Sequence, residues 1–278
     1  MPKIRENIID TKKLLINSIN NFTFFIITFL IAYTIYQLST VLIASSNGTK
    51  TILFYHTIQY PMGLYTHLWD YQTILSTFMA GPVITVFLSF VFWILFRRYK
   101  NRGGIIKMFF FWGMVNSSNM LLGSMISGII SDSGFGNLIN WLYVDLFGKI
   151  LIVFFLIGLL VFIGVISVRS YLESSNSTYL IDEENRHLYF ISGLLIPWFF
   201  GSILLIAIQI PEITLYNIIP FLTMLVLIIP ALARNKAVYL IELPERRKRP
   251  VISLCYIMVM FAFLLIFRIG LMEGISFG

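Results

Sequence analysis

The chain carries seven long, almost uncharged runs of apolar residues, separated by short polar segments. The runs cover approximately residues 22–44, 74–96, 106–130, 147–168, 189–210, 216–233 and 251–271. A helix needs about 20 mostly apolar residues to cross the hydrocarbon core of a bilayer, so each run predicts a transmembrane helix. We therefore expect an all-α, polytopic membrane protein with about seven transmembrane helices.

A further segment, residues 51–70, is only partly apolar and contains the stretch HTIQYPMGLYTHLWD, His56–Asp70. Pro61 and Gly63 would interrupt a continuous helix in this segment. It is also rich in tyrosine and contains Trp69, and such amphipathic rings favour the headgroup layer of a membrane. We expect it to form a re-entrant or interfacial helix that does not cross the bilayer.

The basic residues predict the orientation of the helices. With a cytoplasmic N-terminus and a segment 51–70 that does not cross, all of the 20 Lys and Arg residues fall on the cytoplasmic side except Lys50, Lys149 and Arg268. A full crossing by residues 51–70 would instead place the later blocks RRYKNR and RRKR outside, against the preference of basic residues for the cytoplasm. The pattern predicts an N-in/C-out, multi-pass protein, and we expect it in the inner (cytoplasmic) membrane of a bacterium.

The first residues have a different pattern. Within residues 1–21, Ile4, Ile8, Leu15 and Ile19 recur mostly at helical spacing among polar residues. This spacing predicts an amphipathic helix that lies on the membrane surface. The remaining residues, 22–278, then form a single transmembrane domain.

Composition supports the membrane assignment and limits the partners. The chain is 58% hydrophobic and only 12% charged, whereas soluble domains have about 25% charged residues. The net charge of +7 is explained by basic residues at helix ends, so we expect no nucleic-acid partner. The expected partners are the lipid bilayer and other membrane-protein subunits. The single cysteine, Cys255, lies in an apolar run and supplies neither a disulfide nor a cysteine metal site.

The third apolar run contains the densest set of polar residues. Asn116, Ser117, Ser118 and Asn119 occupy successive positions near its middle. Because polar groups are costly in hydrocarbon, each is expected to have a partner. Two interpretations remain open: a central packing helix, or a substrate cleft. The candidate residues for a polar cleft are Asn116, Ser117, Asn119, Asn137 and Asn140.

Small residues and prolines mark further features. Gly123, Ser127 and Ser131 recur every four residues, a pattern that lets neighbouring helices approach closely. Asp145 and Lys149 are also four apart and could pair at a helix end. Pro197 is expected to bend the fifth run, leaving a carbonyl to be covered by a neighbouring helix or used by a site.

Two stretches resemble a known family. AGPVITVFLSFVFWILFRR (80–98) resembles the Gly-Pro-led helix of site-2-protease-type intramembrane zinc metallopeptidases, and FFFWGMVNSSNMLLGSMISGIISDSGFGNLINWL (109–142) resembles a later helix and turn of related bacterial proteins. The resemblance covers about residues 50–165. It implies a degenerate relative of that family with a similar membrane core.

The family's catalytic motif tests this resemblance. In HExxH, two histidines one helical turn apart bind zinc and the glutamate is the general base. The matching position here reads HTIQY, so His56 would be retained, while Thr57 replaces the base and Tyr60 the second ligand. A zinc site made of His56, His67 and Asp70 is the alternative. It would lack the glutamate base, so we expect no catalytic residues and no cofactor.

Three functions follow from these observations. The first is a non-catalytic membrane subunit or scaffold of a bacterial envelope complex, with a site-2-protease-like core. The second is a transporter or permease subunit for a neutral or anionic solute, using the polar residues of the third run. The third is a zinc-dependent intramembrane protease.

Overall fold

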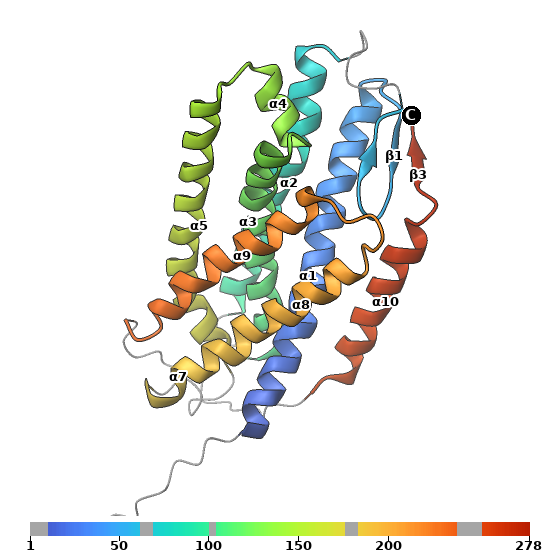
Figure 1. Ribbon diagram of the computed structural model, residues 1–278. Helices are drawn as coiled ribbons and strands as arrows, with labels where there is room; N and C mark the ends of the chain where they lie inside the picture. Colours follow the sequence, from blue (N-terminus) through green and yellow to red (C-terminus); the bar gives the residue numbers. More distant parts are fainter. Residues whose placement is uncertain (1–10, 62–68, 100–103, 176–182, 238–251) are drawn as a thin grey trace, which may run out of the picture.

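The protein is a bundle of helices with a small β-sheet at one end (Figure 1). The computed structural model describes residues 11–61, 69–99, 104–175, 183–237 and 252–278. Its elements are, in order, α1 (Thr11–Ser46), β1 (Thr51–Leu53), β2 (Ile58–Gln59), α2 (Tyr71–Arg98), α3 (Ile105–Ser131), α4 (Phe135–Trp141), α5 (Leu146–Ser174), α7 (Glu183–Phe190), the π-helical turn η1 (Ile191–Leu195), α8 (Ile196–Ala207), α9 (Leu215–Ala233), α10 (Leu254–Gly270) and β3 (Ile275–Phe277).

The helices identify a membrane-embedded protein. Within the described residues, five helical segments are long and apolar enough to cross a bilayer: Thr11–Ser46, Tyr71–Arg98, Leu146–Ser174, Glu184–Ala207 and Leu215–Ala233. The prediction of an all-α membrane protein is confirmed at this level. The two other predicted spans are also helical, but α3 is interrupted by polar residues and α10 has 17 residues.

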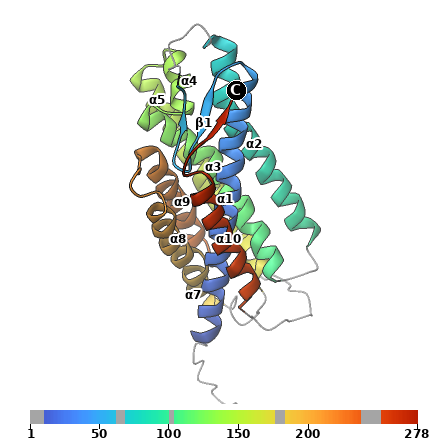
Figure 2. The ribbon, with the colours of Figure 1, turned by 90° about the vertical axis from the view of Figure 1, so that its right-hand side faces the viewer.

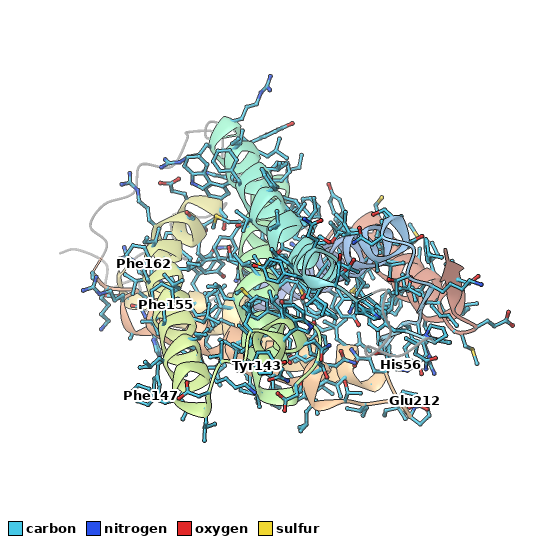
Figure 3. All side chains as sticks on the ribbon, turned by 90° about the horizontal axis from the view of Figure 1, so that it is seen from above. His56, Tyr143, Phe147, Phe155, Phe162 and Glu212 are labelled. Carbon is cyan, nitrogen blue, oxygen red and sulfur yellow. The ribbon has the colours of Figure 1, made fainter. Side chains whose placement is uncertain are left out.

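Helix α3 forms the centre of the bundle, where it packs against α1, α2, α5 and α9. Its buried residues run from Lys107 to Ile129 and cover all sides of the helix. Helix α5 lies at the periphery, and several of its aromatic rings are exposed. Phe147, Phe155 and Phe162 on its outward side are 60–66% exposed (Figure 3). Such a surface fits contact with lipid chains.

The two ends of the bundle differ in charge. We call the end with the β-strands the hairpin end. At the other end, α1 begins, α2 ends, α3 begins and α5 ends (Figure 1). We call it the basic end, because these helix ends carry Lys and Arg residues. At the basic end, Lys107 and Arg169 both pair with Glu173, at 3.7 and 3.0 Å. The Lys107 ammonium also lies 4.7 Å from the centre of the Phe96 ring.

The segment predicted as a re-entrant or interfacial helix is not helical over residues 51–61. Strands β1 and β2 form an antiparallel hairpin, with Ile52 opposite Gln59. Strand β3 pairs with the other edge of β1, with Leu53 opposite Ile275, so the C-terminus closes the sheet (Figure 2). The prediction was wrong here because a local pattern does not show a strand partner more than 200 residues away. Residues 62–68 lie outside the described part.

The N-terminal region also differs from the prediction. Residues 11–21 are not a separate surface helix but the first turns of α1, and residues 1–10 are not described. Asn17 and Asn21 are buried in the bundle, where the Asn17 amide donates to Ser192 Oγ over 3.2 Å. The indole N–H of Trp112 donates to Asn21 Oδ1 over 2.7 Å. These partners hold the polar start of α1 inside the protein, which the surface interpretation did not anticipate.

The bend expected at Pro197 takes the form of a π-helical turn. Pro197 has no N–H, and its ring crowds the preceding turn. The backbone responds by widening, so that the N–H of Ile196 bonds to the carbonyl of Ile191, five residues back. Pro197 cannot donate a hydrogen bond to the carbonyl of Ser192, and this carbonyl accepts one from the hydroxyl of Ser18 on α1 instead. Thus the neighbouring helix covers the freed carbonyl.

Candidate functional site

Asn119, a candidate cleft residue, joins α3 to α9. Its amide nitrogen donates to the carbonyl of Pro220 over 2.7 Å, and its side-chain oxygen accepts the hydroxyl of Thr223 over 2.9 Å. The side chain is 1% exposed. Gly123 lies one turn further on and leaves room for Thr223, because a Cβ at Gly123 would overlap the Thr223 hydroxyl. The side chain of Asn119 is therefore used in packing two helices together.

Asn116 joins α3 to α1 in the same way. Its amide nitrogen donates to the carbonyl of Phe25 over 2.9 Å and to Thr28 Oγ1 over 2.8 Å. Ser117 beside it is fully buried, and its hydroxyl has no hydrogen-bond partner among the described residues. The structure thus places Asn116, Ser117 and Asn119 within helix contacts.

Ser127 connects α3 with a carbonyl that a proline has freed. Pro220 lies within α9 and cannot donate to the carbonyl of Tyr216 four residues earlier. The hydroxyl of Ser127 donates to that carbonyl over 2.6 Å. Of the three small residues predicted to allow close helix approach, Gly123 and Ser127 contact α9, so the prediction is confirmed for these two. Ser131 donates to the carbonyl of Ser127 in its own helix over 2.7 Å.

A pocket lies at the hairpin end, where residues from several segments meet. Its volume is about 290 Å³. We call it the hairpin-end pocket. Its walls come from α1, the hairpin, α2, the α3–α4 turn and the start of α9, and its lining residues are Tyr36, Gln37, Thr40, Thr57, Ile58, Tyr60, Phe78, Asp132, Ser133, Gly134, Asn137, Thr214 and Tyr216. Of the five predicted cleft residues, Asn137 alone belongs to this lining.

The turn between α3 and α4 forms one wall of the pocket. Gly134 has φ of +51°, which a glycine adopts without strain. A Cβ at Gly136 would overlap the carbonyl of Gly128, so the two glycines allow α4 to fold back directly onto α3. Asn137, on α4, belongs to the pocket lining, while Asn140, exposed on the same helix, donates to Asp132 over 2.9 Å.

Asp132 is held at the rim by neighbouring polar groups. Lys149 Nζ lies 3.1 Å from its carboxylate, on the same oxygen that accepts from Asn140. The hydrogen bonds from Asn140 and Lys149 hold the pKa of Asp132 below its usual value, so the carboxylate stays ionised. The expected Asp145–Lys149 pair does not form. Asp145 instead caps α5 by accepting the N–H of Gly148 over 2.9 Å.

Three tyrosines shape the interior of the pocket. The ring of Tyr36 lies against Gly81 of α2, where a Cβ would come within 2.6 Å of it. Glycine in the Gly81-Pro82 pair thus has a packing role in this chain. Tyr216 donates its hydroxyl to the Tyr36 hydroxyl over 3.4 Å. Tyr60 packs edge-on against Trp69 and Phe78, and burial raises its pKa, so it remains a neutral phenol.

A second, smaller cavity of about 10 Å³ lies next to the pocket and shares Tyr36, Gln37 and Tyr216 with it. Its lining includes Gln209 and Asn217. The side-chain oxygens of these two residues, Oε1 and Oδ1, are buried and have no hydrogen-bond partner among the described residues. Both are acceptors, and buried acceptors are costly when they are left unpaired.

His56 lies at the turn of the hairpin, near Glu212 (Figure 3). Its carbonyl accepts the Asn217 amide over 2.8 Å, and its buried Nδ1 has no partner among the described residues. Burial lowers the pKa of His56 below 6.5, Arg268 lowers it further, and Glu212 opposes the shift. The Arg268 guanidinium lies 3.8 Å from the centre of the Tyr55 ring and donates to the carbonyl of Ile210 over 3.0 Å.

The hypothetical zinc ligands occupy different structural contexts. His56 to Tyr60 run through the hairpin turn into β2, so they do not present two ligands on one helix as HExxH does. Asp70 caps α2, where it accepts the N–H of Thr73 over 2.8 Å. His67 lies outside the described residues. Within the described ranges, no three His, Cys, Asp or Glu side chains are grouped as a metal site.

Comparison with known proteins gives no relative for this chain: no protein-family model, curated protein or solved structure matches it.

Proposed function

We propose that this protein is a non-catalytic integral membrane subunit or scaffold of a bacterial envelope complex. The observation that carries this proposal is the use of polar groups in the middle of the bundle. Asn116 and Asn119 donate to backbone carbonyls of α1 and α9, and Ser127 donates to α9. Groups used in this way position helices, whereas a transport path or a reaction centre needs polar groups that remain open to a substrate.

The proposed topology has seven crossings, with the N-terminus in the cytoplasm. The crossings are α1, α2, α3, α5, the segment α7–α8, α9 and α10. Charges at the helix ends support this orientation, because Lys12, Lys13, Arg97, Arg98, Lys107 and Arg169 occupy the basic end. Asp70, Asp132 and Asp145 lie at the hairpin end, where α2 begins, α3 ends and α5 begins. The basic end would therefore face the cytoplasm.

A transporter or permease subunit is the second candidate. The hairpin-end pocket favours it, since it offers a cavity of about 290 Å³ that hydroxyl and amide side chains border together with apolar surface. Among the described residues, its lining contains no Lys or Arg, and its one acid is Asp132. This lining favours a neutral solute over an anionic one. A zinc-dependent protease would need His56, His67 and Asp70 to converge, and nothing in the described geometry favours it.

The scaffold proposal is tested by isolating the chain with its native neighbours. The chromosomal copy is tagged, the membranes are extracted with a mild detergent, and the intact particle is weighed by native mass spectrometry. We expect a particle containing another integral membrane protein at a fixed ratio. Recovery of the chain alone at native expression levels would overturn the subunit assignment. Stoichiometric zinc that disappears in His56→Ala would instead establish the metalloenzyme.

The orientation is tested by cysteine labelling. Cys255 is first replaced by serine, and a single cysteine is then introduced at Lys100, just after α2. A membrane-impermeant thiol reagent should label this site in inside-out vesicles and leave it unlabelled in intact cells. Labelling in intact cells would reverse the orientation.

A further inference from the structure

The hairpin-end pocket calls for an explanation that the scaffold role does not supply. In the middle of the bundle, polar side chains hold helices together, whereas here nine residues with a hydroxyl or amide group border open space. They are Tyr36, Gln37, Thr40, Thr57, Tyr60, Ser133, Asn137, Thr214 and Tyr216. The volume of about 290 Å³ is at the lower limit of the roughly 300–1,000 Å³ usual for ligand sites. The pocket is therefore suited to one small molecule.

The hydroxyls of the lining are biased toward accepting hydrogen bonds. Tyr216 gives its proton to Tyr36, Thr40 gives its proton to the carbonyl of Tyr36 over 3.1 Å, and Ser133 gives its proton to the carbonyl of Ser131 over 3.1 Å. Each oxygen retains lone pairs that accept from a ligand. A ligand with several donors would satisfy the oxygens of the lining.

The charge of the lining excludes strongly charged ligands. Asp132 is the only charged residue in the part of the lining that the structure describes, and Lys149 lies 3.1 Å from its carboxylate. The nearby ammonium opposes the binding of a cation, while the absence of Lys and Arg from the lining leaves an anion without a partner. The rings of Tyr36, Tyr60, Tyr216 and Phe78 add flat apolar surface beside these polar oxygens.

We propose that the hairpin-end pocket binds one small, neutral, polyhydroxylated molecule, of the size and chemistry of a sugar or cyclitol ring. Hydroxyl groups of the ligand donate to the oxygens of the pocket and accept from Asn137, while its carbon skeleton lies against the tyrosine rings. The same chemistry occurs in free sugars and in glycolipid headgroups, which the experiment separates. The proposal does not depend on the scaffold role.

The test uses the full-length protein in detergent, with glucose and myo-inositol as neutral probes and choline and inorganic phosphate as charged probes. Binding is measured by saturation-transfer NMR and by the rise in unfolding temperature. We expect glucose or myo-inositol, but neither charged probe, to bind. A parallel measurement in nanodiscs with and without a monoglucosyl lipid tests the headgroup source, and stabilisation by that lipid alone supports the same site with a lipid-borne ligand.

Matched variants localise the binding. Asn137→Leu replaces an amide of the lining by an apolar side chain, whereas Gln72→Leu, at the start of α2, changes an exposed amide outside the lining. We expect loss of binding in the first variant and unchanged binding in the second. Tyr60→Phe keeps the ring packed against Trp69 and removes one oxygen, so it should weaken binding by about fivefold to tenfold and provides a test if Asn137→Leu does not fold. A response to choline or phosphate alone, no response to any probe, or binding insensitive to both Asn137→Leu and Tyr60→Phe overturns the proposal.

Discussion

The interior of the bundle and the hairpin-end pocket contain the same types of polar residue in opposite situations. In the interior, Asn119 contacts Pro220 and Thr223 within 3 Å, and both ends of its amide are used. In the pocket, Asn137 borders a cavity of about 290 Å³. An asparagine in a membrane helix therefore does not by itself indicate a substrate path. A polar group that packs helices differs from one that can bind a ligand in whether its hydrogen bonds are already made to another element of the protein.

The largest expected effect is steric and concerns the tightly packed interior. A Cβ at Gly164 of α5 would overlap the carbonyl oxygen of Leu227 on α9, whereas a Cβ at Gly158 meets nothing within 4 Å. We expect Gly164→Ala to lower the free energy of unfolding by about 1–3 kcal/mol, because backbone must move. Gly158→Ala on the same helix is the control and should leave it unchanged or slightly raised. Equal effects, measured by chemical unfolding in detergent, would show that α5 and α9 are not closely packed.

A coupled pair of substitutions isolates the hydrogen bond from Ser127 to the carbonyl of Tyr216. In Ser127→Ala this carbonyl loses its partner, and we expect a loss of about 0.6–1.7 kcal/mol in the free energy of unfolding. In the Pro220→Ala background, the new backbone N–H at position 220 can serve the same carbonyl. The second substitution should then cost much less. A double-mutant cycle measures the difference, and additive effects would contradict the role assigned to Ser127.

The smallest effect concerns protonation at the hairpin. The neutral ring of His56 is favoured in the folded protein because burial lowers its pKa below 6.5. As the pH falls through 6.5, the unfolded chain takes up the proton first, so the free energy of unfolding decreases. Above 6.5 both states are neutral and this contribution disappears.

We expect hydrogen exchange at the amides of β1 and β3 to become faster between about pH 8 and about pH 5, after correction for the intrinsic exchange rate. His56→Gln should remove most of that change. An unchanged pH dependence in the variant would mean that groups other than His56 control the stability of the hairpin.

The helical membrane fold could be predicted because it depends on local apolar runs. The run expected at residues 216–233 is α9, Leu215–Ala233, despite the two prolines inside it. Pro220 is tolerated because α3 supplies the hydrogen-bond donor that proline lacks: the Ser127 hydroxyl donates to the carbonyl of Tyr216. Small residues on α3 were recognised as packing positions for the same reason: their spacing is visible in the sequence.

The sheet and the pocket could not be predicted, because both depend on contacts between distant segments. Thr51 pairs with Phe277 at the far end of the chain, and no local pattern in residues 51–70 shows this partner. The pocket combines Tyr36, Thr57, Asn137 and Tyr216 from four separate segments. Asn137 was expected in a polar cleft, but no local pattern shows which other segments border that cleft. The buried Asn17 and Asn21 were missed because their polar surroundings in sequence resemble a surface helix.

Asn119 and Asn137 provide the most direct test of the contrast between packing groups and pocket groups. Each is replaced by alanine, and the free energy of unfolding is measured in the same detergent without added ligand. We expect Asn119→Ala to lose about 1–2 kcal/mol, because it removes two hydrogen bonds between α3 and α9. The Thr223 hydroxyl keeps the carbonyl of Pro220 as its acceptor over 3.0 Å. Asn137→Ala should change it by less than about 0.5 kcal/mol, since no hydrogen bond joins its side chain to any of the described residues. Equal losses in the two variants, or a larger loss at Asn137, would contradict the division of polar residues on which this account rests.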